Sequence, residues 1–344
     1  MNYFSDPSLI SSLPVKRAAY SDRTAWMMAE LSRLIYEKLP LEISTLALFE
    51  NVKKALENDD EKTVIDILNG RLESENEIPS LLESALETGG FELLEPFVKG
   101  STEAMLVRMK PNGDFEGMLV VVFRGTEKKL ADIKTDLTSN LIDVDGGGRG
   151  HKGFIDAFNL VHEQIASALE GYKGHPVYFC GHSLGGALAL VATRLIGNDS
   201  VGATYTFGGP RVGTTKFFQS IKTPVYRVVN AADGVPRIPF GAGFVIFLWL
   251  IRFIPYIGAK LSEFLRENLS GYTHYGNLVY LPALKQSGEY KEAEVIKSPN
   301  YFFVIWNAGL RLLATKGKAG ADDHMMTEYC QKLQAYAKRR QTNI

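Results

Sequence analysis

The chain has 344 residues, of which 45% are hydrophobic and 22% are charged, a composition typical of a folded globular protein. Its 38 basic and 39 acidic residues give a formal net charge of −1, which argues against a nucleic-acid partner. The cysteines, Cys180 and Cys330, are too few for a disulfide framework or a cysteine metal site, and we expect no metal and no cofactor. The first residues lack the unbroken apolar stretch of a signal peptide. We therefore expect a cytoplasmic or peripheral-membrane protein, with secretion by another route left open.

Apolar residues recur at helical spacing in the N-terminal quarter of the chain. The clearest segment runs from Thr24 to about Glu37, with Asp22 as its expected cap. The same pattern continues over residues 46–69. We expect residues 20–90 to form a helical layer packed on the core.

After residue 90 the pattern changes to strands that alternate with helices. The unbroken apolar run Gly117–Phe123 is typical of a strand buried on both faces of a parallel sheet. The alternation predicts an α/β fold, with a mostly parallel central sheet covered by helices on both faces. Strands are expected at Phe91–Val98, Ala104–Met109, Gly117–Phe123, Pro176–Cys180, Gly202–Phe207, Val225–Val229 and Gly276–Leu281, and helices at about Lys152–Leu169, Gly186–Ile196, Thr214–Ser220 and Met326–Lys338.

The segment Gly181-His182-Ser183-Leu184-Gly185-Gly186 has the form Gly-x-Ser-x-Gly. An apolar strand precedes it and an apolar helix follows at once, which is the setting of a nucleophile elbow. Glycines on both sides relieve crowding where the helix passes close to the strand. A structural glycine turn is the alternative, but both flanks favour Ser183 as a nucleophile.

A serine hydroxyl needs a base that takes its proton and an acid that orients the base. In hydrolases with this elbow, the chain order is serine, acid, histidine. Two histidines follow Ser183, namely His274 and His324. His182 adjoins the serine, points elsewhere and is expected to support the turn. Asp233 lies in a loop after an apolar strand, at the edge where such sheets hold their sites, and is the candidate acid.

Further motifs run in a fixed order between about residues 118 and 236. They are Val122-Phe123-Arg124-Gly125-Thr126, Thr135-Asp136-Leu137, His151-Lys152-Gly153-Phe154, Gly181–Gly186, Tyr205–Gly213 and Asn230–Pro236. Together they resemble the class 3 lipases, the fungal-type triacylglycerol lipases of the α/β-hydrolase superfamily. Beyond Pro239 the match is thin until Tyr272–Leu281 and Asp323-His324. The family pattern places the acid on Asp233 and the histidine on His324, which leaves His274 as a structural residue of the cleft wall.

The resemblance also implies an oxyanion hole. The backbone N–H of Leu184, the residue after the nucleophile, is expected as one donor. The resemblance assigns the other donor to Thr126, with support from Gly125 and from Asp136, which would hold the Thr126 hydroxyl. In this family the segment that follows, here residues 127–140, is a lid that opens at a lipid surface.

Residues 240–270 depart from the family pattern. The run Phe244–Ile251 is apolar on every side but too short to span a membrane, and Lys260–Leu269 is amphipathic. The segment is either a core helix followed by a surface helix, or an apolar cap that borders the acyl site and rests on lipid through residues 241–257. Its position between the acid and the histidine favours the cap. The run Tyr301–Trp306 forms either a second wall or core.

We therefore expect a single α/β-hydrolase domain over residues 1–344. Its parts are the helical layer at 20–90, a catalytic core at 91–239 and 271–344, and the cap at 240–270. The expected activity is hydrolysis of lipid carboxylic esters, as a triacylglycerol lipase or carboxylesterase, through a Ser-Asp-His triad and an acyl-enzyme. A phospholipase or galactolipase of the same fold and a catalytically inactive lipid-binding protein are the alternatives. No motif indicates the oligomeric state or the natural ester.

Overall fold

The computed structural model describes residues 2–10, 19–37, 39, 53, 56, 60–65, 81–111, 117–126, 141–197, 199–200, 202–238, 271–284 and 289–342. The expected lid at 127–140, which includes Asp136, and the expected cap at 240–270 lie outside these residues, as does most of the helical segment at 46–69. Within the described residues, no helix has both the length and the apolar character that a membrane span needs.

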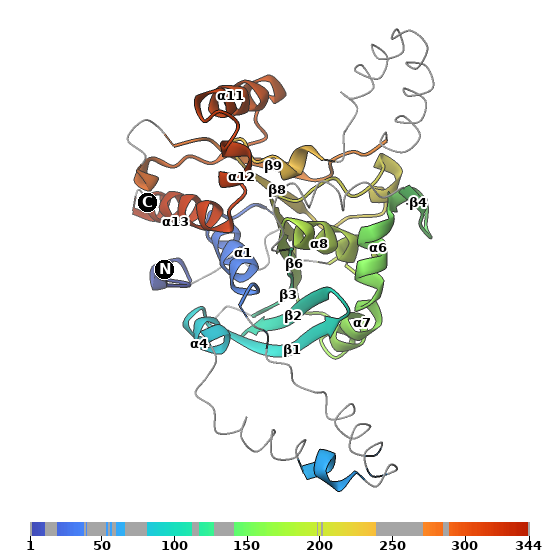
Figure 1. Ribbon diagram of the computed structural model, residues 1–344. Coiled ribbons are helices and arrows are strands. Elements are labelled where there is room, and N and C mark those ends of the chain that lie inside the picture. Colours follow the sequence, from blue (N-terminus) through green and yellow to red (C-terminus); the bar gives the residue numbers. More distant parts are fainter. Residues whose placement is uncertain are drawn as a thin grey trace, which may run out of the picture.

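An eight-stranded sheet organises the described part of the chain, in the order β1-β2-β3-β6-β7-β8-β9-β10 (Figure 1). Its central strands are all parallel: β3 (Met118–Phe123), β6 (Val177–His182), β7 (Thr204–Phe207), β8 (Val225–Asn230) and β9 (Asn277–Leu281). The flanking strands are antiparallel, with β1 (Phe91–Lys99) and β2 (Thr102–Met109) at one edge and β10 (Ile296–Lys297) at the other. A separate pair joins β4 (Leu141–Asp143) to β5 (Arg149–His151).

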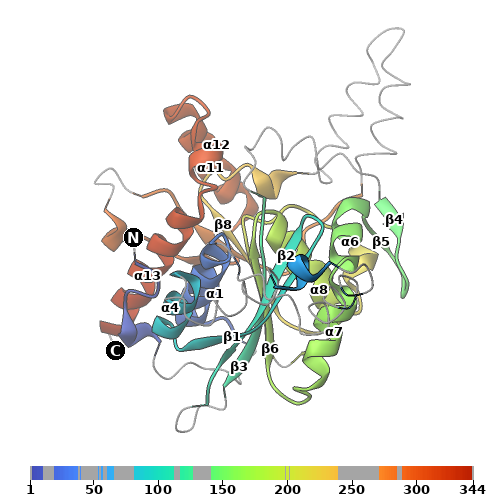
Figure 2. The ribbon, with the colours of Figure 1, turned by 60° about the horizontal axis from the view of Figure 1, so that its bottom comes forward.

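Helices cover both faces of the sheet (Figures 1 and 2). One face packs against α1 (Asp22–Leu34), α4 (Leu81–Thr88) and α13 (Met326–Thr342), and the other against α6 (Lys152–Asn159), α7 (His162–Glu170) and α8 (Leu184–Leu195). Successive residues of a strand point to opposite faces, so β3 supplies Val120 and Val122 to the first core and Leu119 and Val121 to the second. The expected mostly parallel sheet with helices on both faces is confirmed.

The segment between β10 and α13 crosses the carboxyl end of the sheet. It contains α11 (Tyr301–Ala314) and α12 (Ala319–Asp322), and Ala308 and Ala319 pack there on Ala232, just beyond β8. Short 3-10 turns complete the described fold at Pro7–Leu9, Thr215–Phe218, Val235–Arg237 and Tyr290–Glu292.

Several local expectations were wrong. Ser21, not Asp22, caps α1, because the Ser21 backbone is extended and its hydroxyl accepts the Thr24 N–H at 3.3 Å, whereas Asp22 is already helical. The helix expected over residues 152–169 breaks in two before Val161, which is fully buried. The helix expected at residues 214–220 is only a 3-10 turn.

Candidate active site

Ser183 sits at a strained turn between β6 and α8. Its backbone adopts φ 57° and ψ −125°, a conformation that L-residues rarely adopt. The close passage of helix and strand demands glycine on both sides. A Cβ at Gly181 would lie 2.3 Å from the Gly185 carbonyl oxygen, and one at Gly185 would lie 2.1 Å from that of Phe123. The Ser183 N–H donates to the Phe207 carbonyl at 2.9 Å, which fixes the turn against β7.

The structure brings Ser183, His324 and Asp233 into one hydrogen-bonded chain. The distance between Ser183 Oγ and His324 Nε2 is 3.0 Å. His324 Nδ1 lies 3.0 Å from Asp233 Oδ1 and 2.9 Å from Oδ2. These contacts join side chains from the elbow, from the loop after β8 and from the turn before α13. A proton on Ser183 Oγ can pass to Nε2, while the Asp233 carboxylate orients the imidazole through Nδ1.

The Asp233 carboxylate is fully buried and has two further donors. The Val235 N–H donates to Oδ1 at 2.9 Å, and the Tyr329 hydroxyl donates to Oδ2 at 2.5 Å. Burial and the neighbouring Asp233 charge raise the pKa of Tyr329, so the phenol keeps its proton and remains a donor. The Tyr329 hydroxyl oxygen also accepts a hydrogen bond from the Asn230 N–H at 3.0 Å. The carboxylate is therefore held in place by groups other than the histidine.

Gly208 makes room for the Asp233–His324 pair. Its φ is +58°, and a Cβ there would lie 2.6 Å from Asp233 Oδ2 and 3.0 Å from His324 Nδ1. Both the backbone angle and the space exclude a side chain at this position.

His182, beside the serine, contacts the His324 backbone and Tyr36. Its Nε2 lies 2.8 Å from the His324 carbonyl oxygen, which can only accept, so Nε2 carries the proton. Burial and the nearby His324 ring lower the pKa of His182, so the ring stays neutral. Nδ1 then accepts from the hydroxyl of Tyr36, which follows α1, at 3.0 Å.

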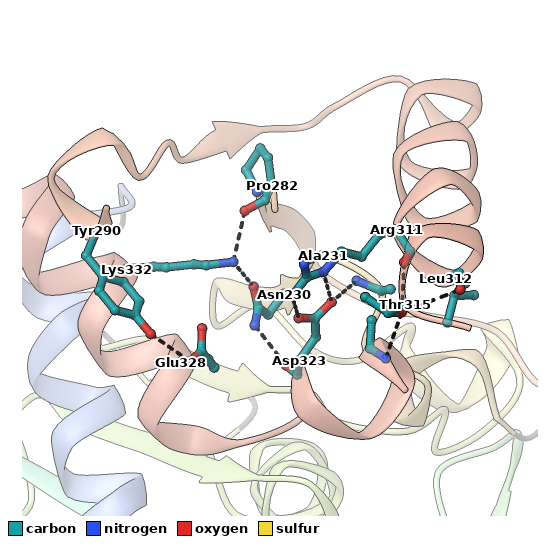
Figure 3. A network of polar contacts seen from close by, with 12 residues as sticks. Asn230, Ala231, Pro282, Tyr290, Arg311, Leu312, Thr315, Asp323, Glu328 and Lys332 are labelled. Carbon is teal, nitrogen blue, oxygen red and sulfur yellow. Dashed lines mark hydrogen bonds and ion pairs between the residues drawn. The ribbon is translucent and has the colours of Figure 1, made fainter. Parts of the chain in front are cut away.

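Asp323, next to His324, is the centre of a buried polar network (Figure 3). Its carboxylate accepts the Ala232 N–H at 3.0 Å and the guanidinium of Arg311 from α11, with Nη2 at 3.1 Å. The Asp323 carbonyl accepts from the Asn230 side chain at 2.8 Å, and Lys332 donates to Asn230 Oδ1 at 2.6 Å. The network joins α11, the acid loop and α13, and it fixes the turn that carries His324.

The candidate oxyanion donors are the backbone N–H of Leu184 and Thr126. Leu184 is the first residue of α8, where a helix has no intrahelical acceptor for its N–H. Strand β3 is paired with β6, and a Cβ at Gly125 would lie 3.3 Å from Ser183 Cβ and 2.5 Å from the His182 carbonyl oxygen. Gly125 therefore lies close against the elbow, and Thr126 follows it in the chain, whereas Asp136 lies outside the described residues.

His274 belongs to a different environment. The pKa of His274 is lowered mainly by burial and next by the charges of Arg227 and Arg211. The His274 ring also bonds to the Pro236 carbonyl. Burial also lowers the pKa of both arginines to about 10. No bond between His274 and either Ser183 or Asp233 appears among the described residues. They also contain no group of three His, Cys, Asp or Glu side chains placed to hold a metal ion.

Sequence reasoning missed the residues that hold the site from outside, namely Tyr36, Gly208, Arg311, Asp323, Tyr329 and Lys332. Gly208 belongs to the family motif Tyr205–Gly213, but the motif alone does not show that the space at Gly208 is taken by the Asp233–His324 pair. In the sequence, Tyr329 and Lys332 are recognisable only as members of an amphipathic helix.

The parallel sheet, the strained serine elbow and the Ser183–His324–Asp233 arrangement place the protein in the α/β-hydrolase class. Within that class, residues 120–242 match the model of the class 3 lipase family. The chain is thus related to the class 3 lipases across the segment that holds the elbow and Asp233.

Curated relatives match the same region. A lipase of Rhizomucor miehei is 35% identical over 153 residues, which are 40% of this chain and 41% of that protein. A secreted mono- and diacylglycerol lipase of Fusarium solani is 36% identical over 105 residues, 28% of this chain and 32% of that protein. The chain therefore spans less than half the length of either relative. The solved lipase structure from Rhizopus microsporus var. chinensis is 20% identical, with a TM-score of 0.49 over 74% of this chain and 79% of that chain.

Proposed function

We propose that the protein hydrolyses carboxylic esters of lipids, as a triacylglycerol lipase or carboxylesterase, with Ser183 as nucleophile, His324 as base and Asp233 as orienting acid. The observation that carries the proposal is the 3.0 Å contact between Ser183 Oγ and His324 Nε2 at a strained elbow, backed by the contacts of Nδ1 with Asp233. The sequence match to class 3 lipases supports the lipid ester as the substrate class.

In the first half of the reaction, Ser183 Oγ attacks the ester carbonyl while His324 Nε2 takes its proton. The tetrahedral oxyanion is stabilised by the N–H of Leu184 and by Thr126. His324 then gives the proton to the leaving alcohol, and an acyl-enzyme remains on Ser183. In the second half, His324 activates water, which releases the fatty acid and restores the serine. Removing one oxyanion donor typically lowers such rates about 10²–10³-fold.

The direct test compares wild type with Ser183→Ala on esters that range from short soluble chains to emulsified triacylglycerols, alongside labelling by a fluorophosphonate. Wild type should react and be labelled, whereas the folded variant should do neither. A wild type that resists labelling and hydrolyses no ester would instead support an inactive lipid-binding protein. Hydrolysis confined to phospholipids or galactolipids would move the substrate to those classes.

Contact of residues 241–257 with a lipid surface, the lid at 127–140 and a role for Asp136 remain proposals on residues outside the described part of the chain. The cytoplasmic or peripheral-membrane location likewise remains a prediction from the sequence.

A further inference from the structure

Helix α11 presents large apolar side chains to solvent. Phe302 is 80% exposed, Leu313 78%, Tyr301 70% and Trp306 69%, and Ala308 is the buried residue of this helix. The run Tyr301–Trp306 is therefore not core, one of the two roles that its sequence suggested. Large apolar side chains that lie exposed side by side indicate a binding surface more strongly than single exposed ones do.

Four of the exposed apolar side chains share one side of the helix. Phe302, Trp306, Leu310 and Leu313 follow one another at intervals of four, four and three residues, so they form one stripe, the α11 face. In Figures 1 and 2, α11 stands at the periphery of the described fold, away from the helices that cover the sheet.

The opposite side of α11 is tied firmly to the site. Leu312 packs with the alanine cluster formed by Ala232, Ala308 and Ala319, and Arg311 pairs with Asp323 at 3.1 Å. The Thr315 hydroxyl bonds back to the Arg311 carbonyl at 2.8 Å (Figure 3). The α11 face is thus held outward on a fixed base, one short helix before His324.

The charged residues of the segment that carries α11 are all basic, although Arg311 is paired with Asp323 and exposed Asp322 follows the segment. Between Val295 and Ala321 the sequence contains no Asp or Glu, but it contains Lys297, Arg311, Lys316 and Lys318. Lys316 and Lys318 are exposed just beyond the helix. Aromatic and apolar side chains bordered by lysines are typical of helices that lie in the interface of an anionic lipid layer.

We propose that the α11 face inserts into the surface of a lipid layer and holds the carboxyl edge of the sheet, with Ser183 and His324, against it. The inference rests on the proposed function for its lipid substrate, although binding itself needs no catalysis. Met325, directly after His324, is 58% exposed and adds an exposed apolar side chain beside the site.

A second copy of the chain fits this face less well than lipid does. Fourteen helical residues span about 21 Å, and with a helix about 10 Å wide the footprint is on the order of 200 Å². A stable protein interface takes about 800 Å² from each partner. A lipid surface has no such threshold, because each inserted side chain adds to the partitioning separately.

The test uses the full chain carrying Ser183→Ala, so that bound lipid is not consumed. Its binding to vesicles of phosphatidylcholine with a minority of phosphatidylglycerol is measured by co-sedimentation, with and without Phe302→Ser, Trp306→Ser and Leu313→Ser together. The triple change should weaken binding about tenfold or more without lowering the thermal transition, because these side chains are exposed. The matched control, Val98→Ser with Leu160→Ser, alters exposed apolar residues near β1 and should bind as before. Unchanged binding by the triple variant would overturn the proposal.

Two further measurements separate the occupants and the functions. Lipid brominated in its acyl chains should quench the tryptophan fluorescence of the bound chain, and this quenching should disappear in Trp306→Phe. Absence of quenching in the bound wild-type chain would refute insertion. Lys316→Ala with Lys318→Ala should weaken binding to phosphatidylglycerol vesicles more than to pure phosphatidylcholine. A wild-type dimer that the triple variant converts to monomer, without vesicle binding by either, would make a second copy the occupant.

With active Ser183, the triple variant should lose emulsified-ester hydrolysis and keep soluble-ester hydrolysis. If the proposed function is wrong, wild type hydrolyses neither ester but still binds vesicles.

Discussion

Tyr329 shows how a residue outside the proposed triad can determine the triad geometry. It is fully buried, donates to Asp233 Oδ2 at 2.5 Å and accepts from the Asn230 backbone at 3.0 Å. One hydroxyl thus connects the acid to the strand end that carries it. A buried carboxylate needs several hydrogen-bond donors, and Tyr329 and Val235 supply those that His324 cannot.

We expect Tyr329→Phe to lower kcat for ester hydrolysis about tenfold, equivalent to about 1.4 kcal/mol, because Asp233 loses one donor and holds His324 less firmly. The buried Asn230 N–H loses its acceptor as well, so unfolding free energy should fall by about 1–3 kcal/mol. Steady-state kinetics and denaturant unfolding measure the two effects. Tyr290→Phe is the control, since Tyr290 bonds Glu328 at 2.7 Å, away from Asp233. A folded Tyr329→Phe protein with wild-type kcat would show that this bond does not position the acid.

At the scale of elements, what could be predicted followed the strength of the local signal. The parallel strands were predictable because β3 is apolar at every position and buried throughout. The elbow was predictable because steric crowding forces glycine at Gly181 and Gly185. The outward position of α11 could not be predicted, because an apolar run has the same sequence whether it is buried in a core or exposed for lipid. The contacts that hold His324 also escaped prediction, since they join residues far apart in the chain, such as Asn230 and Lys332.

Helix α13 brings a lysine into the polar network beside the site. Lys332 is 2% exposed and donates to Asn230 Oδ1 at 2.6 Å and to the Pro282 carbonyl at 2.9 Å (Figure 3). Burial lowers the pKa of Lys332 from 10.5 to about 8, against the opposing attraction of Asp323 and Glu328. The hydrogen bonds and the nearby carboxylates therefore offset only part of the free-energy cost of removing the Lys332 ammonium from water.

This shift predicts a stability change with pH. Between pH 8 and 10.5 the unfolded chain holds the Lys332 proton while the folded chain has released it, so this group makes the folded state more stable as pH rises. The difference in unfolding free energy, wild type minus Lys332→Met, should grow by up to about 3 kcal/mol across that window. Denaturant unfolding at a series of pH values measures it, with Lys173→Met at an exposed site as the control. Parallel curves for wild type and Lys332→Met would contradict the shift.

At the scale of the molecule, the two ends of the described chain close one face of the sheet. Helix α1 packs on α13 and on the central strands, so the first and last helices share a core with α4 (Figure 2). The residues after α1 also reach the site, because Tyr36 bonds His182. The match to class 3 lipases covers residues 120–242 and includes none of these helices. The layer formed by α1 and α13 thus completes a core that the lipase-like segment leaves open on one side.

If this layer is part of the folding unit, damage to α1 should destabilise the whole described fold. Trp26 of α1 is fully buried and meets the Phe4 ring edge-on, with ring centroids 6.2 Å apart. We expect Trp26→Ala to lower the unfolding free energy by about 3–5 kcal/mol, because a large cavity opens against the sheet. Ester hydrolysis well below the unfolding midpoint should stay close to wild type, since Trp26 lies about 12 Å along the helix axis from Leu34, the last residue of α1, and Tyr36 follows only after it. Leu81→Ala, at a position 60% exposed on α4, should change the unfolding free energy little.

Unfolding followed by far-UV circular dichroism, which does not depend on tryptophan fluorescence, should show one transition that moves as a whole, because α1 and α13 pack on the same sheet that contains β6. A variant that loses only an early, partial transition, with the rest unmoved, would mean instead that the terminal helices fold separately from the hydrolase core.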